Sequence, residues 1–74
     1  MKGVWYKRKD GVEIFKVGMY KVLEIEKRPH GGYCLFVYYK GIFKSGEGYF
    51  GTSLPTLLMA KIYGLKKAKE LNII

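Results

Sequence analysis

The chain has 74 residues, which is enough for one domain, residues 1–74, and no more. Its single cysteine and single histidine exclude an intrachain disulfide and a structural zinc site, so we expect no metal and no other cofactor. Fourteen lysine and arginine residues against six acidic residues give a net charge of +8, which favours a nucleic-acid partner.

The uncharged runs of the sequence are too short and too polar to cross a membrane. The longest of them contain Gly, Ser, Thr or Pro and fall short of the roughly 20 apolar residues that a bilayer requires. Nothing resembles a signal peptide, so we expect a cytoplasmic protein with no membrane contact. The chain has no Gln, one Asn and many Lys, a composition that favours a thermophilic source.

A β-hairpin is predicted at the start of the chain, over residues 4–17. Residues 4–8 and 12–17 are rich in aromatic and β-branched side chains, as strands are. Asp10-Gly11 between them is a strong hairpin signal, because the tight turn requires positive φ.

A three-stranded antiparallel sheet is predicted next, over residues 20–50. In its first strand, 20–27, Leu23 and Ile25 alternate with acidic residues, which predicts one apolar face and one face in water. The central strand, 33–40, has apolar or aromatic side chains on both faces, so we expect cover on each side. Residues 42–44 are predicted to extend it after a glycine bulge, residues 45–48 to turn, and residues 49–50 to form a short last strand.

A helix is predicted over residues 53–71, which completes an α+β fold. Thr52 or Ser53 is the expected N-cap, with Pro55 in the first turn. Gly64 costs about 1 kcal/mol relative to Ala inside a helix, so the helix could break there. One broad side is apolar and is expected to cover the sheet: Leu54, Leu57, Leu58, Ile62, Leu65 and Ala68.

Residues that could carry out chemistry have simpler explanations, so we expect no enzyme. The glycines of residues 46–51 match G-x-G-x-x-G, but no second parallel strand can follow the helix, so a turn is the better interpretation. His30 lies in a turn beside Pro29 and has no catalytic partner. Cys34 is expected to be buried in the sheet.

Rings and cations interleave along the strands, a combination that suits nucleic acid. Aromatic rings stack on bases or wedge between them, while lysine and arginine neutralise phosphates. The predicted wedging or stacking residues are Trp5, Tyr33 and Tyr39. The predicted phosphate contacts are Lys7, Arg8, Lys9, Lys21, Lys27, Arg28, Lys40 and Lys44.

The order of hairpin, three-stranded sheet and terminal helix resembles the small basic SH3-like chromatin proteins of archaea. The local similarity is greatest where the glycine turn at residues 44–48 precedes the Pro55 helix start. The resemblance implies minor-groove binding of duplex DNA through the three-stranded face. The chain departs from that family at Glu47, where a basic contact is usual, and at Leu23, where a tryptophan is usual.

A second resemblance is to the plant ethylene-response domain and its phage and integrase relatives. It rests on residues 28–33, on residues 49–52, and on Ala60 and Tyr63. In that family a three-stranded sheet backed by one helix lies in the major groove. Leu57 and Leu58 stand here where acidic residues are usual. Both resemblances imply that the sheet touches DNA and the helix supports it.

The expected function is therefore binding of double-stranded DNA by the sheet, largely without sequence preference, in a nucleoid-associated, archaeal or viral setting. Two alternatives stay open from the sequence. One is a protein-interaction module, such as a viral or plasmid inhibitor whose basic surface meets an acidic partner. The other is a binder of single strands or RNA. Whether the protein forms a homodimer is also open.

Overall fold

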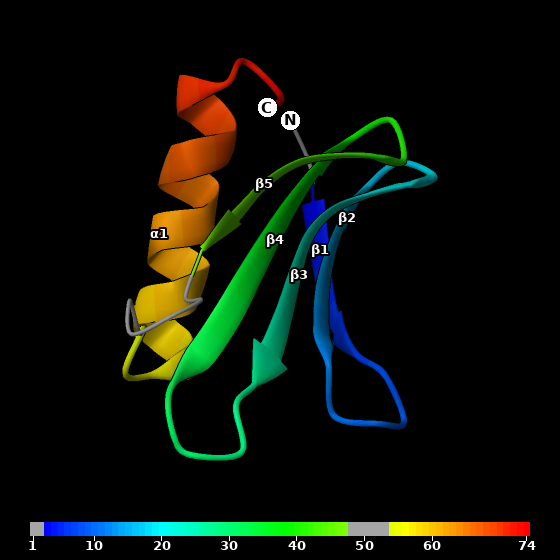
Figure 1. Cartoon of the computed structure of the whole chain (residues 1–74). Helices are drawn as coiled ribbons and strands as arrows, with labels where there is room; N and C mark the ends of the chain where they lie inside the picture. The colour runs from blue at the N-terminus through cyan, green and yellow to red at the C-terminus, as the bar shows by residue number, and fades with distance from the viewer. Residues whose placement is uncertain (1–2, 48–53) are drawn as a thin grey trace.

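A computed structural model describes residues 3–47 and 54–74 of the chain. In chain order its elements are β1 (Gly3–Lys7), β2 (Glu13–Val17), β3 (Tyr20–Lys27), β4 (Tyr33–Tyr39), β5 (Ile42–Glu47) and α1 (Leu57–Glu70). The strands form one antiparallel sheet in the order β1-β2-β3-β4-β5. The helix α1 lies along one face of this sheet (Figure 1). The predicted α+β class is confirmed.

The prediction of a hairpin separate from a three-stranded sheet is wrong. β2 pairs with β3 along its length, with Val17 opposite Tyr20. Only Gly18 and Met19 connect these two strands, and Gly18 has a φ of 63°. A two-residue connection with positive φ reverses the chain at once and places the strands side by side. The hairpin is therefore the edge of a five-stranded sheet.

The end of the sheet also differs from the prediction. Lys40 and Gly41 both have positive φ, 49° and 82°, and Tyr39 lies opposite Ile42. Residues 42–44 therefore start a new strand that runs back along β4, and they do not extend it. The predicted turn at residues 45–48 is strand as far as Glu47. The predicted strand at residues 49–50 lies outside the described residues.

The helix α1 is continuous from Leu57 to Glu70 and does not break at Gly64. Its N-cap is Thr56, whose Oγ1 accepts the Met59 N–H at 3.1 Å. Pro55 therefore precedes the cap instead of lying in the first turn. The predicted caps Thr52 and Ser53 lie outside the described residues.

Small residues form the side of α1 that faces the sheet. Ala60, Gly64 and Ala68, spaced four apart, are the buried residues of the helix. A Cβ atom on Gly64 would lie 3.0 Å from the Cδ1 atoms of both Leu23 and Leu35. Glycine lets the helix backbone approach the sheet this closely, which explains why the helix keeps a residue of low helix propensity.

The predicted core-facing side of the helix is consequently wrong in part. Leu58 and Ile62 point away from the sheet, with 67% and 59% of their surface exposed. A helical wheel finds an apolar arc, but this helix is apolar on opposite sides, and only packing decides which side meets the sheet. The core lies between α1 and the middle strands, around Phe15, Val22, Leu23, Ile25, Leu35, Val37, Ala60 and Ala68.

Candidate functional site

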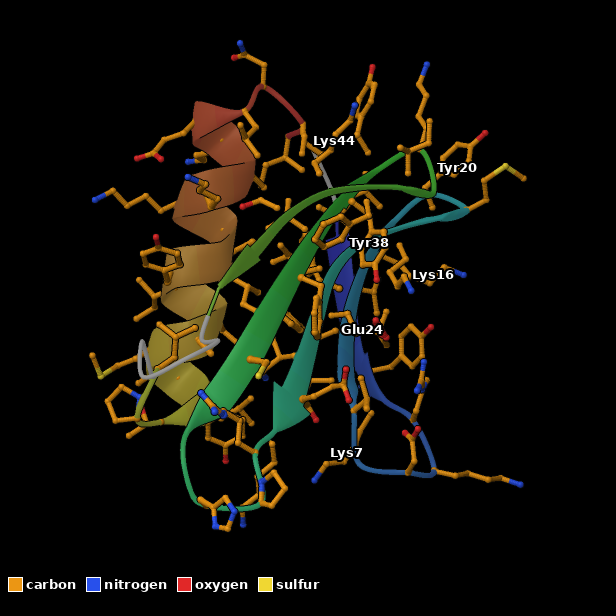
Figure 2. All side chains as sticks on the ribbon, in the orientation of Figure 1. Lys7, Lys16, Tyr20, Glu24, Tyr38 and Lys44 are labelled. Atoms are coloured by element: carbon orange, nitrogen blue, oxygen red, sulfur yellow. The ribbon has the colours of Figure 1, made fainter. Side chains whose placement is uncertain are left out.

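The face of the sheet that points away from α1 is the candidate site. Tyr6, Ile14, Glu24 and Phe36 lie directly opposite one another across β1 to β4, so their side chains share this face. Figure 2 shows Lys16, Glu24 and Tyr38 on the side away from the helix. No helix or strand in residues 3–47 and 54–74 lies over it. The open face comprises Val4, Tyr6, Ile14, Lys16, Lys21, Glu24, Glu26, Cys34, Phe36, Tyr38 and Phe43.

A bulge brings Lys21 to the open face. The pairing of β2 with β3 shifts between Phe15 and Lys16, so that Lys16 lies opposite Lys21. The extra residue on β3 is Val22, which joins the core on the α1 side. Strict alternation along the strand would place Lys21 on the same face as Leu23, but the bulge places it on the opposite face.

Glu24 is the centre of a polar cluster on the open face. Its Oε1 accepts a hydrogen bond from Arg8 Nη1 at 3.3 Å. Its Oε2 accepts hydrogen bonds from the Tyr38 hydroxyl at 3.2 Å and from Lys21 Nζ at 3.5 Å. Glu24 lies on the face opposite Leu23 and Ile25, as predicted, but only 9% of it is exposed, so the prediction that it points into water is wrong. Two cations and a hydroxyl satisfy the buried carboxylate, and they tie the β1–β2 turn to β3 and β4.

Arg8 holds a second carboxylate at the edge of the open face. Its Nη2 lies 2.7 Å from Asp10 Oδ2, and its Nε donates to Asp10 Oδ1 at 3.2 Å. The bidentate contact with Arg8, and then the Val12 N–H, hold the pKa of the Asp10 carboxyl below its usual value. Arg8 is thus shared between two carboxylates, and it is less available to a ligand than its charge indicates.

Four aromatic rings lie on the open face. The Phe43 ring is exposed and lies 6.3 Å from the Phe36 ring and 5.9 Å from the Tyr38 ring. Lys21 Nζ lies 4.1 Å from the centre of the Tyr38 ring, a cation–π contact. Tyr6 is exposed on β1, across the sheet from this group. The face therefore offers rings with lysines among them.

The three rings predicted from the sequence lie on the other side. Trp5 packs on Phe15 at 4.9 Å between ring centres, and Lys61 Nζ of α1 lies 4.7 Å above its ring. Tyr33 is half-buried against the core. Tyr39 is exposed at the margin of this covered face, with Lys40 Nζ 5.5 Å from its ring.

The predicted cations surround the ends of the sheet and do not form one cluster. Lys7 and Lys27 line a hollow of about 560 Å³ together with Tyr33, near the start of α1. Lys44 lines another of about 440 Å³ with Tyr39. Lys7 and Lys44 lie at opposite ends of the sheet (Figure 2).

The remaining predicted cations lie in turns or in the polar cluster. Lys9 and Lys40 are exposed in the turns after β1 and β4, and Arg28 is half-buried in the turn after β3. Arg8 and Lys21 are brought together by a shared ion-pair partner, Glu24.

The sequence analysis did not select Tyr6, Lys16, Phe36, Tyr38 and Phe43 as site residues. The alternation along β4 was predicted correctly, but the rings were chosen from the wrong face. Tyr33 and Tyr39 alternate in phase with Leu35 and Val37, the most buried residues of the strand. That phase was a usable signal, because the face with the aliphatic residues is the one a helix covers.

No family model, curated protein or solved structure matches the chain. Among the described residues, no helix has the length and apolar character needed to span a membrane. The same residues contain no group of three or more His, Cys, Asp or Glu side chains placed to hold a metal ion.

Proposed function

We propose that this protein binds double-stranded DNA through the open face of its sheet, largely without sequence preference. One observation supports this most: a sheet face with no element of the described chain over it carries four rings with Lys16 and Lys21 among them, in a chain of net charge +8. Both families that the sequence resembles place a helix-backed sheet on DNA, and an SH3-like fold of the archaeal chromatin kind is part of the same proposal.

The distribution of ion pairs supports phosphate binding. In the described residues, cations of the chain engage Asp10, Glu13 and Glu24, but not Glu26 or Glu70. Six lysines of the strands and of the turns between them take part in none of the ion pairs of the described residues: Lys7, Lys9, Lys16, Lys27, Lys40 and Lys44. These ammonium groups are available to phosphates, and each phosphate neutralised releases counterions from the duplex.

The exposed rings supply the apolar part of the contact. Tyr6 and Phe43 stand on opposite sides of the open face and are exposed. Apolar side chains inserted between base steps bend a duplex without reading its sequence. We therefore assign the wedging role to these two rings, whereas Tyr39 lies at the margin of the covered face.

A second candidate is binding of single-stranded nucleic acid. Phe36, Tyr38 and Phe43 form a connected group of rings on adjacent antiparallel strands. Such a group can stack successive unpaired bases, which a duplex keeps inaccessible. A protein partner with an acidic surface is the remaining alternative.

Fluorescence anisotropy with a duplex, a single strand of the same sequence and a structured RNA, each over a salt series, tests the proposal. We expect the duplex to bind most tightly, with affinity falling by about 0.9 log unit per log unit of salt for each phosphate neutralised. A preference for the single strand or the RNA would favour the second candidate. Duplex binding that salt leaves unchanged, or no binding at low salt, would contradict the proposal.

Two charge-matched variants localise the contact. Lys16→Gln removes one positive charge from the open face. Lys66→Gln removes one positive charge from an exposed position on α1. We expect Lys16→Gln to weaken duplex binding and to reduce the salt slope by about 0.9, because one phosphate contact is lost. Lys66→Gln should leave the slope unchanged. If the two variants weakened duplex binding equally, the contribution of the lysines to binding would not depend on their location on the open face.

A further inference from the structure

Two lysines of the open face lie directly opposite each other on neighbouring strands. Lys16 of β2 is the register partner of Lys21 of β3. Directly opposed residues have Cβ atoms about 4.5–5.5 Å apart, and like charges at that separation destabilise an antiparallel pair. The pairing of Lys16 with Lys21 therefore does not by itself stabilise the sheet, and the fold alone gives no reason for it.

The β-bulge between β2 and β3 creates this lysine pair. Without the extra residue Val22, Lys21 would share the covered face with Leu23. Bulges are frequent beside functional sites, where they redirect a side chain. Here the bulge moves one ammonium group from the covered face to a position opposite a second one. The sheet thus departs from regular pairing at the point where two cations meet.

One lysine of the pair is held in place and the other is available. Lys21 Nζ lies 4.1 Å from the centre of the Tyr38 ring and 3.5 Å from Glu24 Oε2. Its side chain is 33% exposed, and an ammonium group can donate more than one hydrogen bond, so a donor remains for a ligand. Lys16 lies on the same side of the sheet as Tyr38 and Glu24 (Figure 2) and takes part in none of the ion pairs of the described residues.

The charges around the lysine pair leave one positive charge unmatched. Lys21 is paired with Glu24, whereas Lys16 has no carboxylate of its own. The arginine–carboxylate pair at the edge of the open face is neutral in itself. Glu26 also lies on the open face, but it is five residues along β3 from Lys21, about 16 Å, which exceeds the Debye length of about 8 Å at physiological ionic strength.

We propose that Lys16 and Lys21 hold one backbone phosphate of the bound nucleic acid between their ammonium groups. The inference rests on the proposed function, since it requires nucleic acid on the open face. The unmatched positive charge equals the charge of one phosphodiester in size, and the pair of unesterified oxygens offers an acceptor to each lysine. A carboxylate of an acidic protein carries the same charge. The rings of Tyr38 and Phe43 beside Lys21 favour a partner whose bases can stack on them.

Neither lysine is expected to hold the phosphate alone. Because Glu24 remains in either case, removal of Lys16 or of Lys21 leaves no net positive charge around the pair. The second removal then has no phosphate contact left to break. Residues that act in one network give non-additive changes in free energy, and this non-additivity is the signature of the pair.

A double-mutant cycle on duplex binding, measured by fluorescence anisotropy over a salt series, tests the pair. Lys16→Gln, Lys21→Gln and the double variant should each weaken binding by roughly fivefold and lower the salt slope by about 0.9. Lys7→Gln and Lys44→Gln form the matched control cycle, since these lysines lie at opposite ends of the sheet (Figure 2). Their effects on the free energy of binding, whatever their size, should add.

Circular dichroism and urea unfolding establish that each variant is folded at the temperature of the assay. A double variant roughly 25-fold weaker than the wild type, the product of the two single effects, would overturn the proposal and leave the proposed function standing. Single variants that bind like the wild type would do the same. A wild type that binds neither duplex nor single strand at low salt would overturn both.

Poly-L-glutamate provides the arm for an acidic protein partner. We expect it to bind more weakly than the duplex, because it offers no bases to the rings beside Lys21. Poly-L-glutamate bound as tightly as the duplex, with the same losses in the variants, would assign the pair to carboxylates and also overturn the proposal.

Discussion

The two faces of the sheet bury their centres by different means. On the covered face, α1 closes over Leu23, Leu35 and Val37, which have no exposed surface. On the open face, Ile14 is 1% exposed and Glu24 9% exposed, although no element of the described chain lies over them. Neighbouring side chains alone cover this second pair. The covered face forms an ordinary hydrophobic core with α1. The open face is a single layer of aromatic and charged side chains.

This difference separates stability from binding. Leu23 and Leu35 on the covered face pack closely against the backbone of α1 at Gly64. An open-face residue contacts side chains that can rotate toward a ligand. Substitutions of buried residues on either face should therefore act on the free energy of unfolding, and those of the exposed residues of the open face mainly on affinity.

The largest expected effect is that of Leu35→Ala, on the covered face. Removing a fully buried leucine beneath α1 should lower the free energy of unfolding by about 2–5 kcal/mol, because a cavity remains where helix and sheet meet. Urea unfolding measures this loss. At a temperature where the variant is folded, its duplex affinity should equal that of the wild type. A loss below about 1 kcal/mol would mean that the core is loosely packed.

An intermediate effect is expected from Glu24→Gln, on the open face. The amide keeps the shape of the side chain but loses the charge that holds Arg8, Lys21 and the Tyr38 hydroxyl. We expect a loss of about 1 kcal/mol, below the usual range for hydrogen bonds to charged groups, because both cations are partly exposed. Thermal unfolding measures it. Glu26→Gln, the same change at an exposed residue of β3, is the control and should be nearly neutral. Equal losses would show that the cluster contributes nothing.

The smallest effect is expected at Asp10, at the edge of the open face. Its carboxyl has a lowered pKa in the folded protein, so its contribution to stability is full above the unfolded value of 3.8. That contribution disappears as the pH falls through the lower, folded pKa. Asp10→Asn should therefore be slightly less stable than the wild type at neutral pH and equally stable in strong acid. Acid titration followed by circular dichroism checks this, and a difference that persists in strong acid would contradict it.

The sequence was most informative where alternation and turn residues agree. The strand predicted at residues 20–27 is β3 with the same ends, and the alternation of Leu35 and Val37 against Phe36 is as predicted. Residue patterns did not reveal the reversal at Lys40, because lysine seldom adopts positive φ and only Gly41 signalled a change.

The predictions for the face of Lys21 and for the buried side of α1 were wrong for the same reason. In both cases the packing of two elements overrides the side-chain periodicity of the sequence. The extra residue Val22 moved Lys21 to the opposite face. The small residues of α1 drew the helix close and left Leu58 and Ile62 outside. Neither outcome follows from the hydrophobic periodicity of the sequence. The first depends on how β2 pairs with β3, and the second on how α1 packs on the sheet.

The order of the strands also has a consequence for how the chain acquires its structure. Every strand pairs with its neighbour in sequence, and the turns between them span two to five residues. Because only short loops have to close before neighbouring strands pair, we expect rapid folding for a protein rich in β structure. The late, slower event should be the docking of α1 on β3 and β4, which joins segments far apart along the chain.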